Sequence, residues 1–299
     1  MTYEFLNRTP GKGLRGLVAG ALLTGAMALP AVAETTVTAV MHSGLRVLDP
    51  VITTAHITRN HAYMIYDVLI AVNEKFEPKP QMADWTVSDD GLVYTFTLRD
   101  GLVFHDGTPV TMADAEASLK RWAQKDSGGQ LIMEVTESLT ATDDKTLVWT
   151  LKVPFGPFLD TLAKQSALPP FIMPARVAAT PVDTAISEYV GSGPFIFNEA
   201  EFKPGVSVTY DKFEGYVPRE EPADWMAGGK VVNVDHVVWT TMPDIQTSLN
   251  ALMAGEIDYV EAVPVDLLPL LEGADDVVYE KREPFGYQTI GRMNFLHPP

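Results

Sequence analysis

Segments in which apolar and polar residues alternate recur along this chain and predict β-strands. Residues 35–41 alternate Thr, Val and Ala, and residues 93–98 alternate strictly after a turn at residues 89–91. By the same criterion we expect further strands at residues 139–141, 147–151, 195–197, 206–210, 234–240 and 257–260.

Apolar residues at helical spacing predict four helices between these strands. The clearest covers residues 111–122, where Thr111 is the expected N-cap and Asp114 stands at the capping-box position. Three more helices are expected at residues 60–70, 158–166 and 243–254. Strand-rich segments with interspersed helices indicate α+β architecture early in the chain and α/β crossovers later, which together make a mixed α/β fold.

The N-terminal residues have the pattern of a cleavable signal peptide. Three cations precede an uncharged run rich in Leu, Ala and Gly at residues 17–28, and Ala31 and Ala33 supply the small residues of a cleavage site. The apolar run is shorter than the ~20 residues that span a bilayer, and no twin-arginine pair precedes it. We therefore expect a Sec-type signal peptide at residues 1–33, with cleavage before Glu34.

Charge and composition exclude several classes of function. The net charge of −17 becomes −19 without the three cations and one anion of residues 1–33. Such acidity argues against binding to nucleic acids or anionic membranes, which need a basic face. The chain has no cysteine, so it forms no disulfide, thiolate zinc site or lipid-modified Cys anchor. Export without a lipid anchor indicates the periplasm, and the 266 residues after the signal peptide are compatible with about two domains.

The sequence shows no motif of a common enzyme or metal site. His105 and Asp106 are too few ligands for a metal ion, and His56 and His61 lack the i, i+4 spacing that puts two imidazoles on one helical face. The Gly-Ser-Gly run at residues 191–193 is not a nucleophile elbow. Its glycines are expected to adopt positive φ where the chain re-enters the sheet. We predict no catalytic residue, no metal site and no cofactor.

An ordered series of motifs resembles family 5 of the bacterial extracellular solute-binding proteins, the peptide- and nickel-binding components of ABC importers. The likeness covers essentially all of residues 35–299. The longest match runs through residues 79–91, 94–101 and 104–111. Shorter matches fall in the expected order at Asp49-Pro50, at the Tyr-Asp-Val-Leu run of residues 66–69, at Gly-Ser-Gly-Pro-Phe of residues 191–195 and at Ala-Gly-Glu-Ile-Asp of residues 254–258.

The resemblance implies a two-lobed clamshell of the type II periplasmic binding protein kind. Lobe I is then expected at residues 34–72 and 167–260, with an inserted subdomain at residues 73–166. Residues 261–299 are expected to begin lobe II, which relatives continue well beyond the point where this sequence stops. The acidic and basic groups that peptide-binding relatives place on peptide termini lie in that lobe and are expected to be missing here.

The resemblance also implies a function. A monomeric periplasmic protein, not inserted in the membrane after signal cleavage, is expected to close its lobes around a peptide or similar small polar solute and deliver it to the permease subunits of an ABC transporter. Three alternatives stay open at this point: nickel or metal-chelate binding on the same fold, an exported hydrolase, and a sensor subunit that reports its ligand to a membrane receptor.

Thr53, Thr54 and His56 are the first candidates for contact with the solute. They follow the Asp49-Pro50 turn, in a loop that faces the cleft in the family. Their hydroxyl groups and the free backbone N–H groups of such a loop suit a polar solute. Ordinary turn chemistry of Ser and Thr accounts for these residues equally well.

Tyr63, Gln165 and Ser166 are the second group of candidates. Gln165 and Ser166 end the helix expected at residues 158–166, and the resemblance places this segment at the border of the pocket. The alternative is a helix C-terminus at which the helix dipole favours Lys164. Tyr63 is suited to stack or hydrogen-bond in the cleft, but its helical spacing with apolar residues also fits a place in the core.

Overall fold

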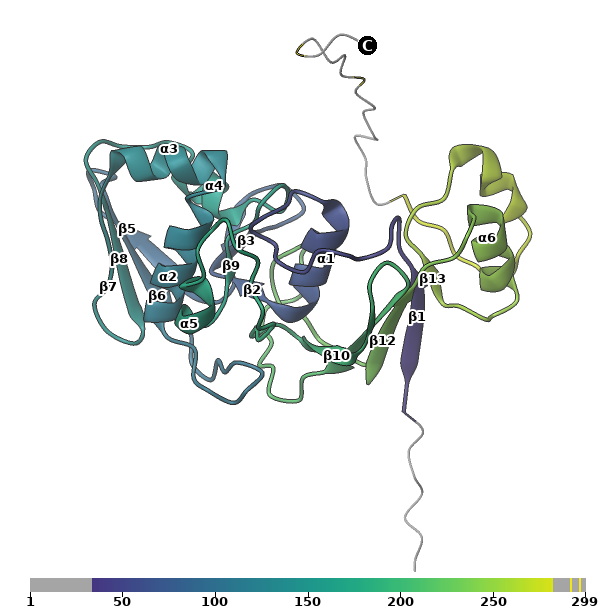
Figure 1. Ribbon diagram of the computed structural model, residues 1–299. Helices are drawn as coiled ribbons and strands as arrows, with labels where there is room; N and C mark the ends of the chain where they lie inside the picture. The colour runs from purple at the N-terminus through teal and green to yellow at the C-terminus, as the bar shows by residue number, and fades with distance from the viewer. Residues whose placement is uncertain (1–33, 282–290, 292–295, 297–299) are drawn as a thin grey trace, which may run out of the picture. The chain divides into compact units, whose positions relative to one another are not determined.

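The computed structural model describes residues 34–281, 291 and 296 (Figure 1). The predicted signal peptide lies outside the described residues, as do most of residues 282–299. The strands are β1 (Thr36–Val40), β2 (Asp67–Val68), β3 (Ile70–Val72), β4 (Pro78–Pro80), β5 (Ala83–Val87), β6 (Val93–Leu98), β7 (Thr136–Ala141), β8 (Thr146–Leu151), β9 (Phe171–Ile172), β10 (Phe195–Lys203), β11 (Ser207–Lys212), β12 (His236–Thr240) and β13 (Tyr259–Val260). The helices are α1 (His56–Ile65), α2 (Met112–Trp122), α3 (Ser127–Val135), α4 (Phe158–Ala163), α5 (Ala175–Ala178), α6 (Ile245–Met253) and the 3₁₀ helix η1 (Val265–Leu270).

A five-stranded sheet of order β10-β11-β12-β1-β13 joins segments that are far apart in the sequence. β1 runs parallel to β12 and to β13, with Thr36 opposite His236 and Ala39 opposite Tyr259. β10, β11 and β12 are antiparallel neighbours. Helix α6 lies between β12 and β13 in sequence and is the crossover that parallel strands require. The predicted mixed α/β fold, with its later α/β crossovers, is thus confirmed.

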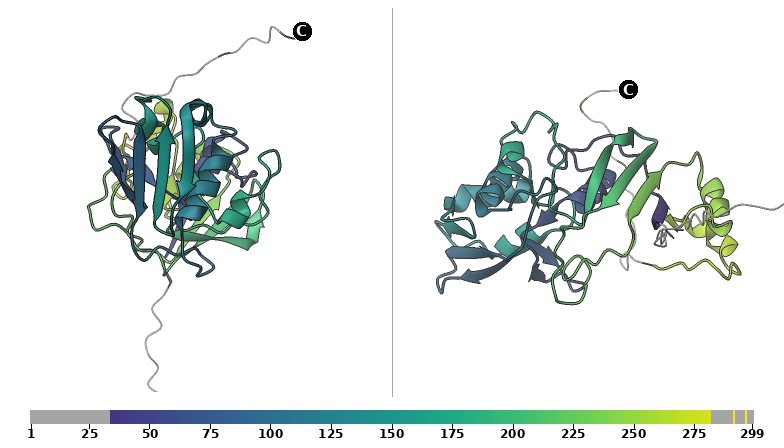
Figure 2. Two further views of the ribbon diagram at one scale, coloured as in Figure 1. Left: turned by 90° about the vertical axis from the view of Figure 1, so that its left-hand side faces the viewer. Right: turned by 90° about the horizontal axis from the view of Figure 1, so that it is seen from below.

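A second sheet, of order β5-β6-β8-β7, is antiparallel throughout. Alternate residues of β6 and β8 are buried, as their sequence pattern predicts; in β8 these are Leu147, Trp149 and Leu151. Helix α2 packs against this sheet (Figure 2). The indole N–H of Trp122 donates to the carbonyl oxygen of Leu168 at 2.6 Å, which satisfies the polar atom of this buried ring.

The ends of two helices show how local sequence sets their bounds. A capping box begins α2, because the Asp114 carboxylate accepts hydrogen bonds from both the backbone N–H and the hydroxyl of Thr111, each at 2.8 Å. This confirms the prediction from the sequence. Helix α6 begins later than predicted, because the side chain of Asp244 caps it by accepting from the N–H of Thr247 at 2.8 Å.

Two further helix predictions are wrong in their bounds. The helix expected at residues 60–70 begins earlier, as α1, and Tyr66 is already extended. The buried apolar run that follows forms β2 and β3, which pair with β9 and β4. Periodicity does not separate a fully buried strand from a buried helical face, which explains the error. Helix α4 ends at Ala163, so residues 164–166 lie in the following loop.

The glycines at positions 191 and 193 serve a different purpose from the one predicted. Neither has a positive φ. A Cβ atom on Gly191 would lie 1.7 Å from the carbonyl oxygen of Ile65, and one on Gly193 would lie 2.7 Å from the carbonyl carbon of the same residue. The N–H of Gly193 donates to that oxygen at 3.0 Å. Glycine is needed here because two backbones touch, which sequence alone did not reveal.

Candidate ligand-binding site

The parallel strands β12, β1 and β13 end at one edge of the five-stranded sheet. In open α/β sheets, ligands bind outside the carboxyl ends of the strands. His42 lies two residues beyond β1, and Glu261 follows β13 directly. This edge is therefore where a solute-binding surface is expected.

Glu261 connects this edge of the sheet to helix α1. Its Oε2 accepts hydrogen bonds from the backbone N–H and the Nδ1 of His42, at 2.9 and 2.7 Å. Its Oε1 accepts from Nδ2 of Asn60 at 2.8 Å. The rings of His42 and His56 meet edge to face, with centroids 6.4 Å apart. Burial lowers the pKa of His56, with Arg59 and His42 adding to the effect, so the imidazole is neutral at pH 7 and offers one donor and one acceptor.

Helix α1 presents Arg59 and Tyr63, one turn apart, to the loop that follows α4. Nη1 of Arg59 donates to the hydroxyl of Ser166 at 3.1 Å, and the Tyr63 hydroxyl donates to the carbonyl oxygen of Gln165 at 3.3 Å. The Tyr63 ring also packs edge to face on Phe171 at 4.8 Å. Burial raises the pKa of Tyr63, so its phenol stays protonated. Two hydrogen bonds thus join this face of α1 to the loop.

Trp225 reaches the same loop from a third segment of the chain. Its Nε1 donates to the side-chain oxygen of Gln165, while 41% of the residue remains exposed. Trp225 has a φ of 57° and Ala167 a φ of 60°. A left-handed backbone costs a non-glycine residue about 1–3 kcal/mol, and such strain gathers at binding sites, where the surroundings hold it. Two strained residues therefore flank the Gln165–Trp225 contact.

The six candidate residues divide into two groups. Tyr63, Gln165 and Ser166 lie together at the surface just described, and His56 lies in the adjoining cluster with Glu261. Thr53 makes an ordinary turn contact, because its hydroxyl accepts from the N–H of Ala55 at 3.2 Å. Thr54 is exposed beside it. We call this candidate site the α1 surface; it comprises His42, His56, Arg59, Asn60, Tyr63, Gln165, Ser166, Trp225 and Glu261.

Five residues of the α1 surface were not singled out from the sequence: His42, Arg59, Asn60, Trp225 and Glu261. Arg59 lies four residues before Tyr63 and shares its helical face. The helix expected at residues 60–70 began one residue too late to include it. For Trp225 the sequence offered only a weak signal, namely an aromatic residue in a segment rich in Pro, Gly and acidic residues. Glu261 gave no local clue, because its partners Asn60 and His42 lie about 200 positions earlier.

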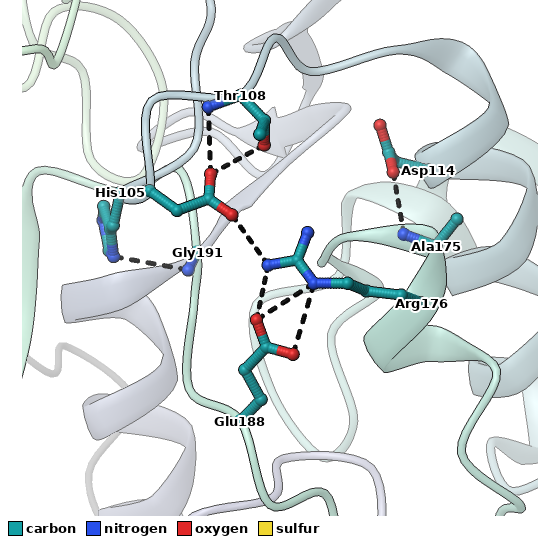
Figure 3. A network of polar contacts seen from close by, with 8 residues as sticks. His105, Thr108, Asp114, Ala175, Arg176, Glu188 and Gly191 are labelled. Atoms are coloured by element: carbon teal, nitrogen blue, oxygen red, sulfur yellow. Dashed lines mark hydrogen bonds and ion pairs between the residues drawn. The ribbon is translucent and has the colours of Figure 1, made fainter.

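Lys164, His105 and Asp106 belong to other networks. Lys164 pairs with Asp126 and lies over the Trp122 ring, away from the α1 surface contacts. In Figure 3, the N–H of Gly191 donates to Nδ1 of His105 at 3.3 Å.

Arg176 lies at the centre of the network in Figure 3, where its Nη2 donates to Oδ2 of Asp106 at 2.7 Å. A second carboxylate, that of Glu188, pairs with the same guanidinium. Within the described part of the chain, no three His, Cys, Asp or Glu side chains are grouped so that they could hold a metal ion. The described helices also include none long and apolar enough to cross a membrane.

Comparison with known proteins identifies the family. Residues 77–299 match the family described as bacterial extracellular solute-binding proteins, family 5 Middle. The chain belongs to this family. A probable peptide ABC transporter periplasmic-binding protein of Sinorhizobium fredii is 47% identical to this family 5 chain over 291 residues, which cover 95% of the chain and 54% of that protein. The glutathione-binding protein of Escherichia coli K12 is 30% identical over 266 residues, or 86% of the chain and 48% of that protein.

A solved structure agrees with this assignment. The binding protein AgaA of A. tumefaciens R10, in complex with agropinic acid, has a TM-score of 0.64 and 28% identity to the family 5 chain, covering 80% of it and 46% of AgaA. The mixed α/β fold is therefore that of the type II periplasmic binding proteins of family 5. The chain spans about half the length of the relatives that it matches.

Proposed function

We propose that this chain forms part of the solute-binding component of an ABC importer, which captures a peptide or a similar small polar solute and delivers it to the membrane permease. The observation that carries the proposal is the α1 surface, which combines donors, acceptors and the exposed indole of Trp225. Two of its residues, His42 and Glu261, lie at the carboxyl edge of the sheet. A relative of the chain in Sinorhizobium fredii is named as a probable peptide ABC transporter periplasmic-binding protein. The family is one of solute-binding proteins, and we propose no catalytic step for this member.

The proposed protein works as a monomer that closes around its solute. Lobe I comprises residues 34–72 and 167–260, with an inserted subdomain at residues 73–166, and residues 261–299 begin lobe II. Two observations support these boundaries. The sheet β5-β6-β8-β7 falls wholly within residues 73–166, and Glu261, the first residue assigned to lobe II, is hydrogen-bonded to the end of β1 and to α1. Movement of Glu261 would therefore alter its hydrogen bonds to His42 and Asn60 in the α1 surface.

The proposed location is the periplasm, after removal of residues 1–33. The family consists of extracellular solute-binding proteins, and a relative is named as periplasmic. The charged n-region, the short apolar run and the small residues before Glu34 support export by the Sec route.

A thermal-shift screen of the full-length gene product tests this function. The panel holds di-, tri- and oligopeptides, opines, neutral sugars, and nickel with and without histidine. A ligand at ~100 times its Kd stabilises the folded state by ~2.7 kcal/mol. We expect at least one polar solute to raise the melting temperature by roughly 5–10 °C.

The same mixtures, sampled over time by mass spectrometry, provide the control. A binding protein returns its ligand unchanged, so the amount of the stabilising solute should stay constant. Steady consumption of that solute would contradict the proposed function and favour a hydrolase.

A further inference from the structure

We infer that the α1 surface holds a carboxylate group of the solute, with Arg59 as its principal partner. This inference rests on the proposed function and adds the chemical class of the solute: a small molecule that carries a carboxylate next to a planar or apolar part. Three observations support it, namely the unused donors of Arg59, the free hydroxyl proton of Ser166 and the exposed indole of Trp225.

Not all N–H donors of Arg59 have an acceptor among the described residues. A guanidinium has five N–H donors. Nε and Nη2 of Arg59 donate to the same oxygen, Oδ1 of Asn60, at 3.3 and 2.9 Å, and Nη1 donates to the hydroxyl of Ser166 at 3.1 Å. Among the residues that the structure describes, one N–H on each terminal nitrogen has no acceptor. Two such donors match the two oxygens of a carboxylate, the bidentate arrangement that Arg favours.

The charge of Arg59 is not balanced by the protein nearby. Among the described residues, no carboxylate lies within ion-pair distance of its guanidinium. The nearest acidic neighbour in the network is Glu261, and Asn60 separates the two, accepting from Arg59 and donating to Glu261. Glu261 already accepts three N–H groups from His42 and Asn60. Since no described carboxylate pairs with the half-buried Arg59, a carboxylate of the solute is the partner that we infer for it.

Ser166 and Trp225 shape the rest of the subsite. The hydroxyl oxygen of Ser166 accepts a hydrogen bond from Arg59. The O–H of Ser166 can then donate to a carboxylate bound beside Arg59. Trp225 is fixed beside it through Gln165, and its exposed indole offers a flat apolar surface to the neighbouring part of the solute. Ala167 and Trp225 both have positive φ, a conformation that persists in non-glycine residues only where the surrounding structure holds it.

Calorimetric titration of the full-length gene product with matched pairs of probes tests the inference. The pairs are trialanine and trialaninamide, N-acetylalanine and its amide, and gluconate and gluconamide. Each pair differs in the carboxylate alone, so the three pairs distinguish a peptide, an acylated amino acid and a sugar acid as its source. We expect at least one acid to bind about 10- to 100-fold more tightly than its amide, since hydrogen bonds to charged groups have that effect.

Variants assign the preference to one residue. Arg59→Gln should remove the acid preference, and Arg59→Lys should retain part of it, because charge remains but the paired donors are lost. Lys152→Gln, which makes the same charge change at an exposed residue after β8, should leave it unchanged. The melting temperature of each variant without ligand confirms folding.

The outcomes separate the inference from the proposed function. An acid preference that disappears in Arg59→Gln but not in Lys152→Gln supports the carboxylate subsite. Equal affinity for acid and amide, or a preference that survives in Arg59→Gln, overturns the subsite and leaves the proposed function standing. Failure of every probe and of every solute in the thermal-shift panel contradicts the proposed function itself.

Discussion

Replacement of Arg121 by Met should lower the free energy of unfolding by about 3–5 kcal/mol, because it leaves the carboxylate of Asp49 buried without its cation. Arg121 is 2% exposed and Asp49 is 1% exposed. Nη1 and Nη2 of Arg121 donate to the two oxygens of Asp49 at 3.1 and 2.7 Å. The same oxygens accept the backbone N–H groups of Val51 and Ile186. The pair therefore joins helix α2 to the loop before α1 and to the segment around residue 186.

Urea unfolding of three variants measures this effect. Lys120→Met changes the neighbouring residue on the same helix and breaks an exposed pair with Glu116, so it should cost less than about 1 kcal/mol. The double change Asp49→Asn with Arg121→Met should recover part of the loss, because no unpaired charge stays buried. If Arg121→Met proves as stable as Lys120→Met, the buried pair does not hold these segments together.

Acid should destabilise the protein well before its carboxylates are protonated, and His61 should be a main cause. His61 is fully buried on α1, where its Nδ1 hydrogen-bonds with the Tyr210 hydroxyl at 2.8 Å and its ring meets Phe197 edge to face. Burial lowers the pKa of His61 from 6.5 to about 3. His105 adds to the effect, because burial lowers its pKa to about 4.

The direction of the effect follows from which state binds the proton first. Between about pH 6.5 and pH 3 the unfolded chain protonates His61 and the folded chain does not. Stability due to His61 is therefore complete above about pH 6.5, and it falls by about 1.4 kcal/mol per pH unit as the pH drops toward 3. Urea unfolding at pH 7.5, 6.5, 5.8 and 5.0 should show this slope, since most carboxylates stay ionised over that range.

Two variants isolate the contribution of His61. His61→Asn keeps a hydrogen-bonding group near Tyr210 but does not titrate, so its stability should vary less with pH than that of the wild type. His236→Gln should act in the opposite direction. Hydrogen bonding to Asp211 raises the pKa of His236, so the native residue stabilises the fold on the acid side, and its loss should steepen the decline. Parallel pH profiles for wild type and His61→Asn would rule out His61 as the cause.

Much of the fold could be predicted because the information is local. The alternation in residues 93–98 and the capping box at Thr111 and Asp114 each lie within a few residues. The end of α1 was misplaced, because the buried run after Tyr66 looks the same as a helical face until its partner strands are known. The backbone contact between Gly191 and Ile65 could not be predicted from the sequence either, since 126 residues separate them.

The sequence pointed to only some residues of the candidate site, because several of its contacts join segments far apart in the chain. The family resemblance pointed to Tyr63, Gln165 and Ser166, which the structure brings together. The charge that carries the inferred chemistry, on Arg59, was one cation among 22 in the sequence. Its importance comes from what surrounds it: neutral acceptors on Asn60 and Ser166 in place of a carboxylate.

Hydrogen–deuterium exchange of the full-length gene product, with and without a saturating solute from the panel, tests most directly whether the solute binds at the α1 surface. We expect slower exchange in residues 164–168 and 222–228, the loops that carry Gln165, Ser166 and Trp225, and unchanged exchange in β5 and β6. Protection confined to the sheet β5-β6-β8-β7, with both loops exchanging as fast as in the free protein, would contradict it.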